Sequence, residues 1–200
     1  MADKALMTTL VTCLAINGTL PLPLATLILG RDVSLAIAAI YFRYASLPAP
    51  KTFTRYWDFS LPSAEVHPTT ISKLNTFLQL GLIGTTMCVS LLHDPSATQS
   101  VAGGLLFSMQ ESLGGPEGVD WLVKGMSGVV AGTTMYSGLS YVWTKSAVKI
   151  LGDDEVLKKK QGFRGRMIIA GTFGSVIALA MALWWREQQK GEVVKKVEGR

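Results

Sequence analysis

Five long apolar segments, separated by polar connections, dominate the sequence. They run over about residues 5–20, 24–44, 71–92, 121–143 and 167–185. The hydrocarbon core of a bilayer is about 30 Å thick and is crossed by ~20 apolar residues in an α-helix. A soluble domain would instead space its apolar residues at helical or strand period. The sequence therefore predicts an all-α integral membrane protein, a bundle of about five transmembrane helices.

The composition agrees with a membrane protein. Charged residues make up 16% of the chain, against roughly 25% in an ordinary soluble domain, and the mean hydropathy is +0.33. The net charge of +5 does not indicate a nucleic-acid partner, because the basic residues lie between apolar segments. The two cysteines, Cys13 and Cys88, lie inside apolar segments and form neither a disulfide framework nor a metal-ligand pattern.

The charges of the connections predict the orientation of the segments. Five crossings place the N-terminus and the connections around residues 45–70 and 144–166 on one side. That side carries a set of basic residues: Arg43, Lys51, Arg55, Lys145, Lys149, Lys158, Lys159, Lys160, Arg164 and Arg166. The opposite connection, about 93–120, has no lysine or arginine. The positive-inside rule therefore assigns the basic side to the cytoplasm or to the matrix of an organelle.

Two features bear on individual segments. The tail after Trp185 is basic, yet five crossings place it on the acidic side, so the fourth segment is a stronger prediction of a span than the fifth. Within the fourth segment, Gly128 and Gly132 form a GxxxG pair. Such a pair lets another helix approach closely, as in a homodimer, or serves as ordinary packing glycines.

Charged residues inside a span cost ~2.5–3.5 kcal/mol on insertion scales and indicate function by default. Arg31-Asp32 lies in the middle of the second segment. One interpretation is an internal ion pair that only helps packing, but adjacent residues on a helix point in different directions. We therefore favour an Arg31 that faces a polar cavity and binds an anionic group such as phosphate.

Two further charges lie at segment ends. Lys73, at the start of the third segment, either meets a lipid phosphate or is an interfacial lysine whose ammonium reaches the water. Asp3 by itself is typical of a carboxylate at a helix start. His67, beside Pro68, has no second histidine nearby and is interpreted as a loop residue rather than a metal ligand.

Several stretches resemble a known family. The opening Met-Ala-Asp-Lys-Ala-Leu-Met, the Ile28-Leu-Gly-Arg31-Asp32 run, the stretch from Arg55 to Thr76 and the stretch from Trp143 to Leu151 together resemble eukaryotic, fungal-type cardiolipin synthases. These enzymes are CDP-alcohol phosphatidyltransferases. The resemblance covers about residues 1–151, the C-terminal part of that domain. Residues 152–200 add a basic loop, a further transmembrane helix and a charged tail.

The family's signature is Asp-x2-Asp-Gly-x2-Ala-Arg-x8-Gly-x3-Asp-x3-Asp, which ends in Asp-Pro-x-Ala-Asp-Lys in cardiolipin synthases. Met1-Ala2-Asp3-Lys4 matches the end of it, so the resemblance makes Asp3 the last aspartate, a metal ligand and the base on the acceptor alcohol. It implies two Mg²⁺ or Mn²⁺ ions, whose other ligands would precede Met1. We therefore expect an N-terminally truncated chain that is inactive alone, because one carboxylate cannot hold two hard cations.

By the same resemblance, the complete protein transfers a phosphatidyl group from CDP-diacylglycerol to phosphatidylglycerol. It would release CMP in the mitochondrial inner membrane, with its active site facing the matrix and Arg31 and Lys73 binding substrate. Two other hypotheses stay open. One is an inactive membrane protein with a packing or partner-binding role. The other is a small transporter with Arg31 as its anion site, although no inverted repeat is visible.

Overall fold

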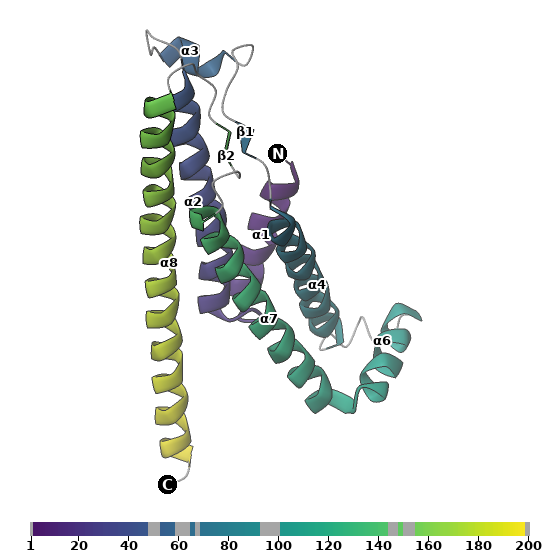
Figure 1. Ribbon diagram of the computed structural model, residues 1–200. Helices are drawn as coiled ribbons and strands as arrows, with labels where there is room; N and C mark the ends of the chain where they lie inside the picture. The colour runs from purple at the N-terminus through teal and green to yellow at the C-terminus, as the bar shows by residue number, and fades with distance from the viewer. Residues whose placement is uncertain are drawn as a thin grey trace.

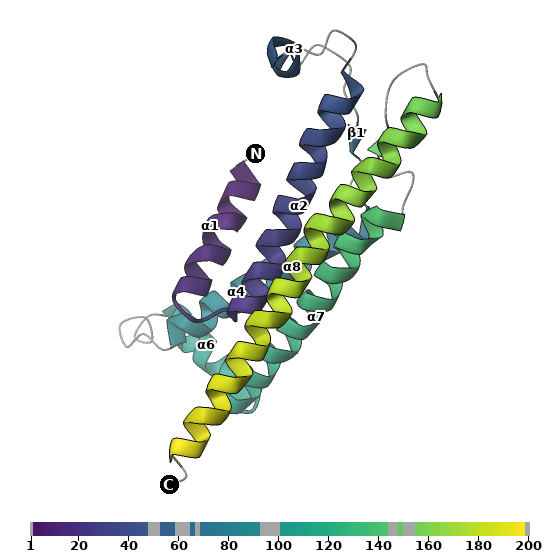
Figure 2. The same cartoon turned by 90° about the vertical axis from the view of Figure 1, so that its left-hand side faces the viewer.

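The computed structural model describes residues 2–47, 53–58, 65–66, 69–92, 101–143, 148–149 and 155–198. The described helices are α1 (Ala2–Ile16), α2 (Leu22–Ser46), α3 (Phe53–Trp57), α4 (Thr70–Leu92), α6 (Val101–Ser112), α7 (Gly115–Trp143) and α8 (Glu155–Glu198). The long helices run side by side as a bundle (Figures 1 and 2). The prediction of an all-α membrane protein is confirmed at this level. A two-residue β-pairing and helix α6 were not predicted.

Local chemistry sets the ends of the first helices. Gly18 has a φ of 72° in the turn after α1, a backbone conformation that glycine adopts without strain. The backbone amides of Thr19 and Leu20 then donate to the carbonyl of Leu14, each at 3.1 Å. Pro21 is the N-cap residue of α2, which begins at Leu22, and Pro23 lies in the first turn, where a missing N–H costs nothing. The result is a tight reversal that lays α1 against α2.

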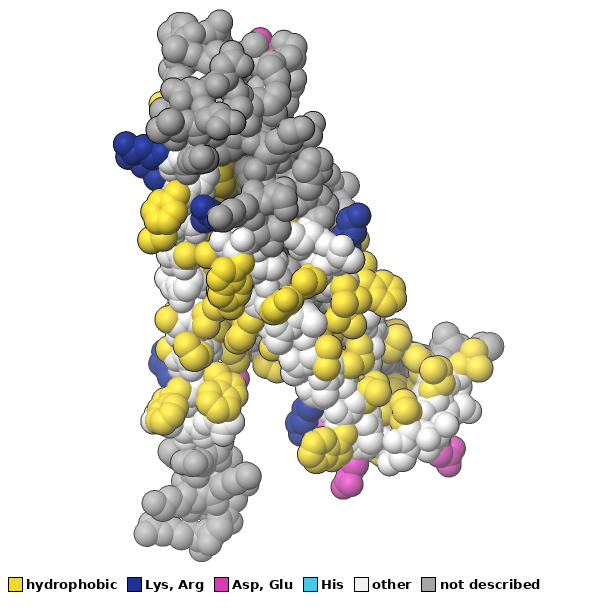
Figure 3. All heavy atoms as spheres, viewed as in Figure 1, with side chains coloured by type: hydrophobic (Ala, Val, Ile, Leu, Met, Phe, Trp, Pro, Cys, Tyr) yellow, Lys and Arg dark blue, Asp and Glu magenta, His cyan; other side chains and the backbone are white. Residues whose placement is uncertain are grey.

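In the part of the chain that the structure describes, three helical stretches are long and apolar enough to cross a membrane: Leu22–Ser46, Thr70–Leu92 and Lys160–Lys190. They correspond to the second, third and fifth predicted segments. The first segment is confirmed as a helix, but its apolar stretch, Lys4–Ile16, is shorter. Many large apolar side chains are exposed on the surface of the bundle, as suits a lipid environment (Figure 3).

The relative strength given to the last two segments was wrong. The fifth segment qualifies as a span and is the most apolar of the three, whereas α7, which contains the fourth, does not meet the same criterion. The reason is composition, because α7 carries Lys124 together with many glycine, serine and threonine residues. The basic loop is also partly helical: Arg164 and Arg166 lie inside α8, which begins at Glu155 and continues through the charged tail to Glu198.

Close approach of helices occurs at glycines other than the predicted pair. A Cβ at Gly30 would clash with Val176, one at Gly138 with the ring of Phe173, and one at Gly165 with the ring of Phe42. These three contacts fix α8 against α2 and α7. By contrast, a Cβ at Gly128 or Gly132 would meet nothing within 4 Å. Within the described residues, the GxxxG pair therefore holds no helix.

The two connections predicted to share one side meet at one end of the bundle. Strand β1 (Glu65–Val66) pairs antiparallel with β2 (Val148–Lys149), with Glu65 opposite Lys149. Helix α3 lies at the same end (Figure 1). Arg43, in the last turn of α2, holds α3 there, because its Nε donates to the Tyr56 carbonyl at 3.0 Å.

Candidate functional site

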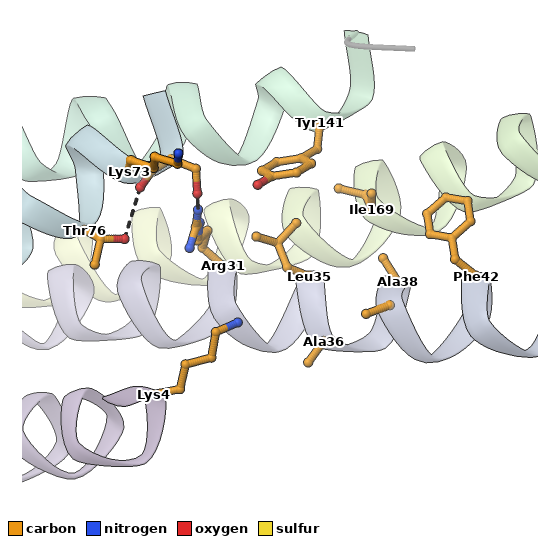
Figure 4. Close-up of a pocket in the computed structure, with 12 residues that line it drawn as sticks. Lys4, Arg31, Leu35, Ala36, Ala38, Phe42, Lys73, Thr76, Tyr141 and Ile169 are labelled. Carbon is orange, nitrogen blue, oxygen red and sulfur yellow. Dashed lines mark hydrogen bonds between the residues drawn. The ribbon is translucent and has the colours of Figure 1, made fainter. Parts of the chain in front are cut away.

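A pocket of about 390 Å³ lies between α1, α2, α4, α7 and α8. Its polar end holds Lys4, Arg31, Ser72, Lys73 and Thr76, and its apolar end follows α2 from Leu35 toward Phe42 (Figure 4). The remaining lining residues are Ala36, Ala38, Ala39, Tyr141 and Ile169. Both predicted substrate-binding residues, Arg31 and Lys73, thus line one pocket although 41 other residues separate them in the sequence.

Arg31 is the buried charge of this pocket, with a side chain only 7% exposed. Its Nη2 donates to the hydroxyl of Ser72 on α4 and, at 3.0 Å, to the hydroxyl of Ser137 on α7. Its buried Nε–H has no acceptor among the described residues. A guanidinium has five N–H donors, so this arginine still has hydrogen bonds to offer.

The expectation that Arg31 and Asp32 pair poorly was wrong, and the alternative of an ion pair between them is confirmed. Nη1 of Arg31 lies 2.7 Å from Oδ1 of Asp32, and the Asp32 side chain is 32% exposed. Their Cβ atoms do point in different directions, but the long arginine side chain turns its guanidinium back to its neighbour. The pairing does not occupy the whole guanidinium, and Arg31 lines the pocket as expected.

The pocket is electropositive at its polar end. Lys4 on α1 and Lys73 on α4 join Arg31, and none of the described residues that line the pocket is acidic. Figure 4 shows the ammonium of Lys4 and the hydroxyl of Tyr141 directed toward Arg31 from opposite sides. Arg31 is buried, so its charge acts on an anion in the cavity with less screening than in water, whereas Lys4 and Lys73 are exposed and their charges are screened more strongly. Sequence reasoning placed Lys4 at a helix start and did not include it in the site.

The start of α4 is ordered by its cap. The hydroxyl of Thr69 accepts the backbone N–H of Ser72 at 3.2 Å, the usual role of a threonine before the first helical turn. This fixes the first turn, which carries Ser72 and Lys73, at the polar end of the pocket. The placement of Lys73 at the start of the third segment is confirmed.

A buried polar seam continues from the pocket between α4 and α7. Oδ1 of Asn75 accepts from the hydroxyls of Thr133 at 2.9 Å and Thr134 at 3.0 Å, and Nε2 of Gln79 donates to Thr134 at 3.2 Å. Sequence reasoning missed this seam. A signal was present, because Ser72, Asn75 and Gln79 recur at helical spacing within an apolar segment and therefore share one face.

Asp3 lies in the first turn of α1, directly before Lys4. Its side chain is outside the described residues, as is His67. Among the side chains that the structure describes, no three His, Cys, Asp or Glu residues form a group that could hold a metal ion. The described residues therefore do not fit a two-cation centre by themselves.

Comparison with known proteins identifies similar proteins for part of the chain. No protein-family model and no solved structure matches. The chain is 61% identical over 84 residues to "Cardiolipin synthase (CMP-forming) / mitochondrial hydrolase fusion protein" of Schizosaccharomyces pombe. It is 48% identical over 84 residues to "Probable cardiolipin synthase (CMP-forming)" of Drosophila melanogaster. It is also 37% identical over 93 residues to "Cardiolipin synthase (CMP-forming)" of Homo sapiens.

These matches are partial on both sides. They cover 42–46% of this chain and 14%, 26% and 31% of the three relatives. The chain thus spans less than a third of the length of the curated relatives it matches. Over that segment, the expected resemblance is confirmed: the chain is similar to CMP-forming cardiolipin synthases of fungi, fly and human.

Proposed function

We propose that this chain takes part in cardiolipin formation, in which the phosphatidyl group of CDP-diacylglycerol passes to phosphatidylglycerol. The hydroxyl oxygen of the acceptor attacks the phosphorus that bears the diacylglycerol. The bond from that phosphorus to the CMP oxygen breaks, and CMP leaves. The observation that carries the proposal is the Arg31 pocket, in a chain whose relatives are named cardiolipin synthase.

In this proposal, the polar end of the pocket binds a phosphate of the lipid substrate. Arg31 supplies its free N–H groups, including the buried Nε–H that has no protein acceptor among the described residues. Lys73 and Lys4 supply point charges from α4 and α1. A planar guanidinium suits two phosphate oxygens, whereas an ammonium attracts without fixing orientation. Arg31 therefore orients the phosphate and the two lysines raise its affinity.

Asp3, in the first turn of α1, takes the proton of the acceptor hydroxyl in this proposal, because the resemblance makes it the last aspartate of the family's signature. Mg²⁺ or Mn²⁺ would neutralise the pyrophosphate, but the described residues do not by themselves form a site for such ions. We expect residues 1–200 alone to release no CMP. The basic end of the bundle faces the mitochondrial matrix in this proposal, since the positive-inside rule applies to that side.

A chimera tests the proposal. The segment of the Schizosaccharomyces pombe relative that precedes the residue aligned with Met1 is joined to residues 1–200. The chimera is placed in nanodiscs that contain CDP-diacylglycerol and phosphatidylglycerol, and CMP release is measured with Mg²⁺. We expect turnover from the chimera, loss of turnover without phosphatidylglycerol, and none from residues 1–200. A well-folded chimera that binds lipid but never forms cardiolipin would favour a packing or partner-binding role.

A further inference from the structure

We propose that Ser72 is a direct ligand of the pocket's phosphate and that Ser137 is a positioning residue for Arg31. The inference deepens the proposed function and rests on its anion site. It concerns two serines whose hydroxyls lie on different helices, α4 and α7, and meet at one nitrogen of Arg31. Neither serine was singled out by the sequence.

Nη2 of Arg31 donates two hydrogen bonds. This nitrogen has two N–H groups, and the two serine hydroxyls accept from it, one each. The guanidinium plane is consequently fixed by α4 and α7 together, while Asp32 holds Nη1 from within α2. Three partners at fixed positions leave a planar group no freedom to rotate. The direction of the remaining N–H groups is therefore set before any anion arrives.

Each of the two serines also has a hydroxyl proton that it can still donate. A hydroxyl that accepts from a guanidinium still has its own O–H to donate. Within the described residues, neither Ser72 nor Ser137 donates its hydroxyl proton to a protein acceptor. The positive charge of Arg31 draws electron density from the bonded oxygen and makes each O–H a stronger donor.

The two serines differ in their access to the pocket. Ser72 is 7% exposed and lines the pocket, so its O–H can reach an anion there. Ser137 is fully buried, with no exposed surface, and is not among the lining residues. Ser72 thus binds the phosphate directly, and Ser137 acts only through Arg31. Both roles predict weaker anion binding on loss of the hydroxyl, but with a larger loss at Ser72.

The chain offers a matched control. Ser140 lies on α7, three residues after Ser137, and is 8% exposed. Its hydroxyl donates to the carbonyl of Ser137 at 2.7 Å and so stays within its own helix. Ser140→Ala therefore removes a buried α7 hydroxyl without touching the guanidinium. A general effect of removing a buried serine would appear in this variant too.

The experiment is a phosphate titration of residues 1–200 in detergent micelles, read as the rise in melting temperature, with chloride at matched ionic strength. Variants are Ser72→Ala, Ser72→Thr, Ser137→Ala and Ser140→Ala. We expect Ser72→Ala to raise the phosphate dissociation constant on the order of tenfold, the scale of one hydrogen bond to a charged group. Ser72→Thr should restore it, Ser137→Ala should raise it about threefold, and Ser140→Ala should leave it unchanged.

A second measurement separates orientation from folding. In an Arg31→Lys background, no fork remains for the serines to orient, so Ser137→Ala should no longer change the phosphate dissociation constant. If Ser72→Ala and Ser137→Ala lower the melting temperature but leave phosphate affinity as in the unaltered chain, the serines only tie helices together and this inference is overturned. If the unaltered chain shows no phosphate-specific shift, the anion site of the proposed function fails as well.

Discussion

Nη2 of Arg31 on α2 donates to the hydroxyl of Ser137 on α7 at 3.0 Å, across 106 positions of the sequence. The same nitrogen donates to Ser72 on α4. A charge inside a membrane-spanning helix thereby receives hydrogen-bond partners from two other helices. Removing one hydrogen-bond partner of such a buried group leaves the other partner unsatisfied, which lowers the stability of the fold. Substitutions at this site thus need a readout that separates binding from folding.

Arg31→Lys keeps the charge but removes the planar fork. A lysine ammonium cannot reproduce the bonds to Asp32, Ser72 and Ser137 and also face a phosphate. In the chimera, we expect the apparent affinity for phosphatidylglycerol to weaken together with the rate, by on the order of tenfold or more, because a bond between charged groups is worth ~1.5–3 kcal/mol. Lipid titrations of CMP release measure this.

Arg43→Lys is the matched control for that variant. Arg43 lies on the same helix, outside the pocket, and holds the Tyr56 carbonyl instead. It should lose little activity. If Arg31→Lys were as active as the unaltered chimera, Arg31 would contribute to helix packing and not to substrate binding.

Lys73→Gln removes a single positive charge, without the planar set of hydrogen bonds that a guanidinium would make. Lys73 is exposed at the pocket mouth, so its contribution is screened by solvent. We expect the phosphatidylglycerol concentration at half-maximal rate to rise about two- to fivefold in the chimera, with the maximal rate nearly unchanged. The exposed Lys124 on α7, which pairs with Asp120, provides the comparison as Lys124→Gln. A drop in maximal rate without a change in lipid dependence would assign Lys73 a different role.

Gly138→Ala tests the packing of α8. A Cβ at this position would clash with the ring of Phe173, which is almost fully buried. Overpacking of this kind costs about 1–3 kcal/mol, so we expect a lower unfolding free energy in a titration with denaturing detergent. Gly132→Ala is the control on the same helix, since its Cβ meets nothing. Equal stability of the two variants would mean that α8 packs elsewhere.

The helices could be predicted from the sequence because burial in lipid requires long apolar blocks. A polar cavity at Arg31 could be predicted as well, but not the set of residues that line it, because that set depends on how the helices pack. Lys4 and Lys73 meet Arg31 only after α1 and α4 pack on α2. Whether a glycine allows two helices to approach closely also depends on the residue that faces it in the fold. The GxxxG pattern at Gly128 therefore did not predict which glycines pack against a described helix, whereas Gly138 accommodates Phe173.

The polar seam lies between these extremes. Its members on α4 have helical spacing that can be seen in the sequence, but their partners on α7 become evident only in the fold. The pairing of Arg31 with Asp32 was considered from the sequence but judged unfavourable, for a different reason. The directions of Cβ atoms say little about the far end of an arginine, which has enough rotatable bonds to turn back to its neighbour.

The orientation of the bundle can be tested by cysteine labelling. Asp58→Cys reports the end at which β1 and β2 meet, and Glu117→Cys reports the opposite end, both in a background with Cys13→Ser and Cys88→Ser. In mitoplasts, we expect an impermeant maleimide to label position 117 directly and position 58 only after the membrane is permeabilised. Labelling of both positions from one side would contradict the arrangement of spans proposed above.

Asp3→Asn tests the assigned base. The substitution keeps the shape of the side chain but removes its charge and its ability to take a proton. In the chimera, we expect the rate to fall by about 10²–10⁴-fold, the usual scale for loss of a general base. The phosphate dissociation constant of residues 1–200 should change little, since the anion ligands that we propose are Arg31, Ser72 and the two lysines. Near-normal turnover of this variant would reduce Asp3 to a helix-start carboxylate, whatever the outcome at Arg31.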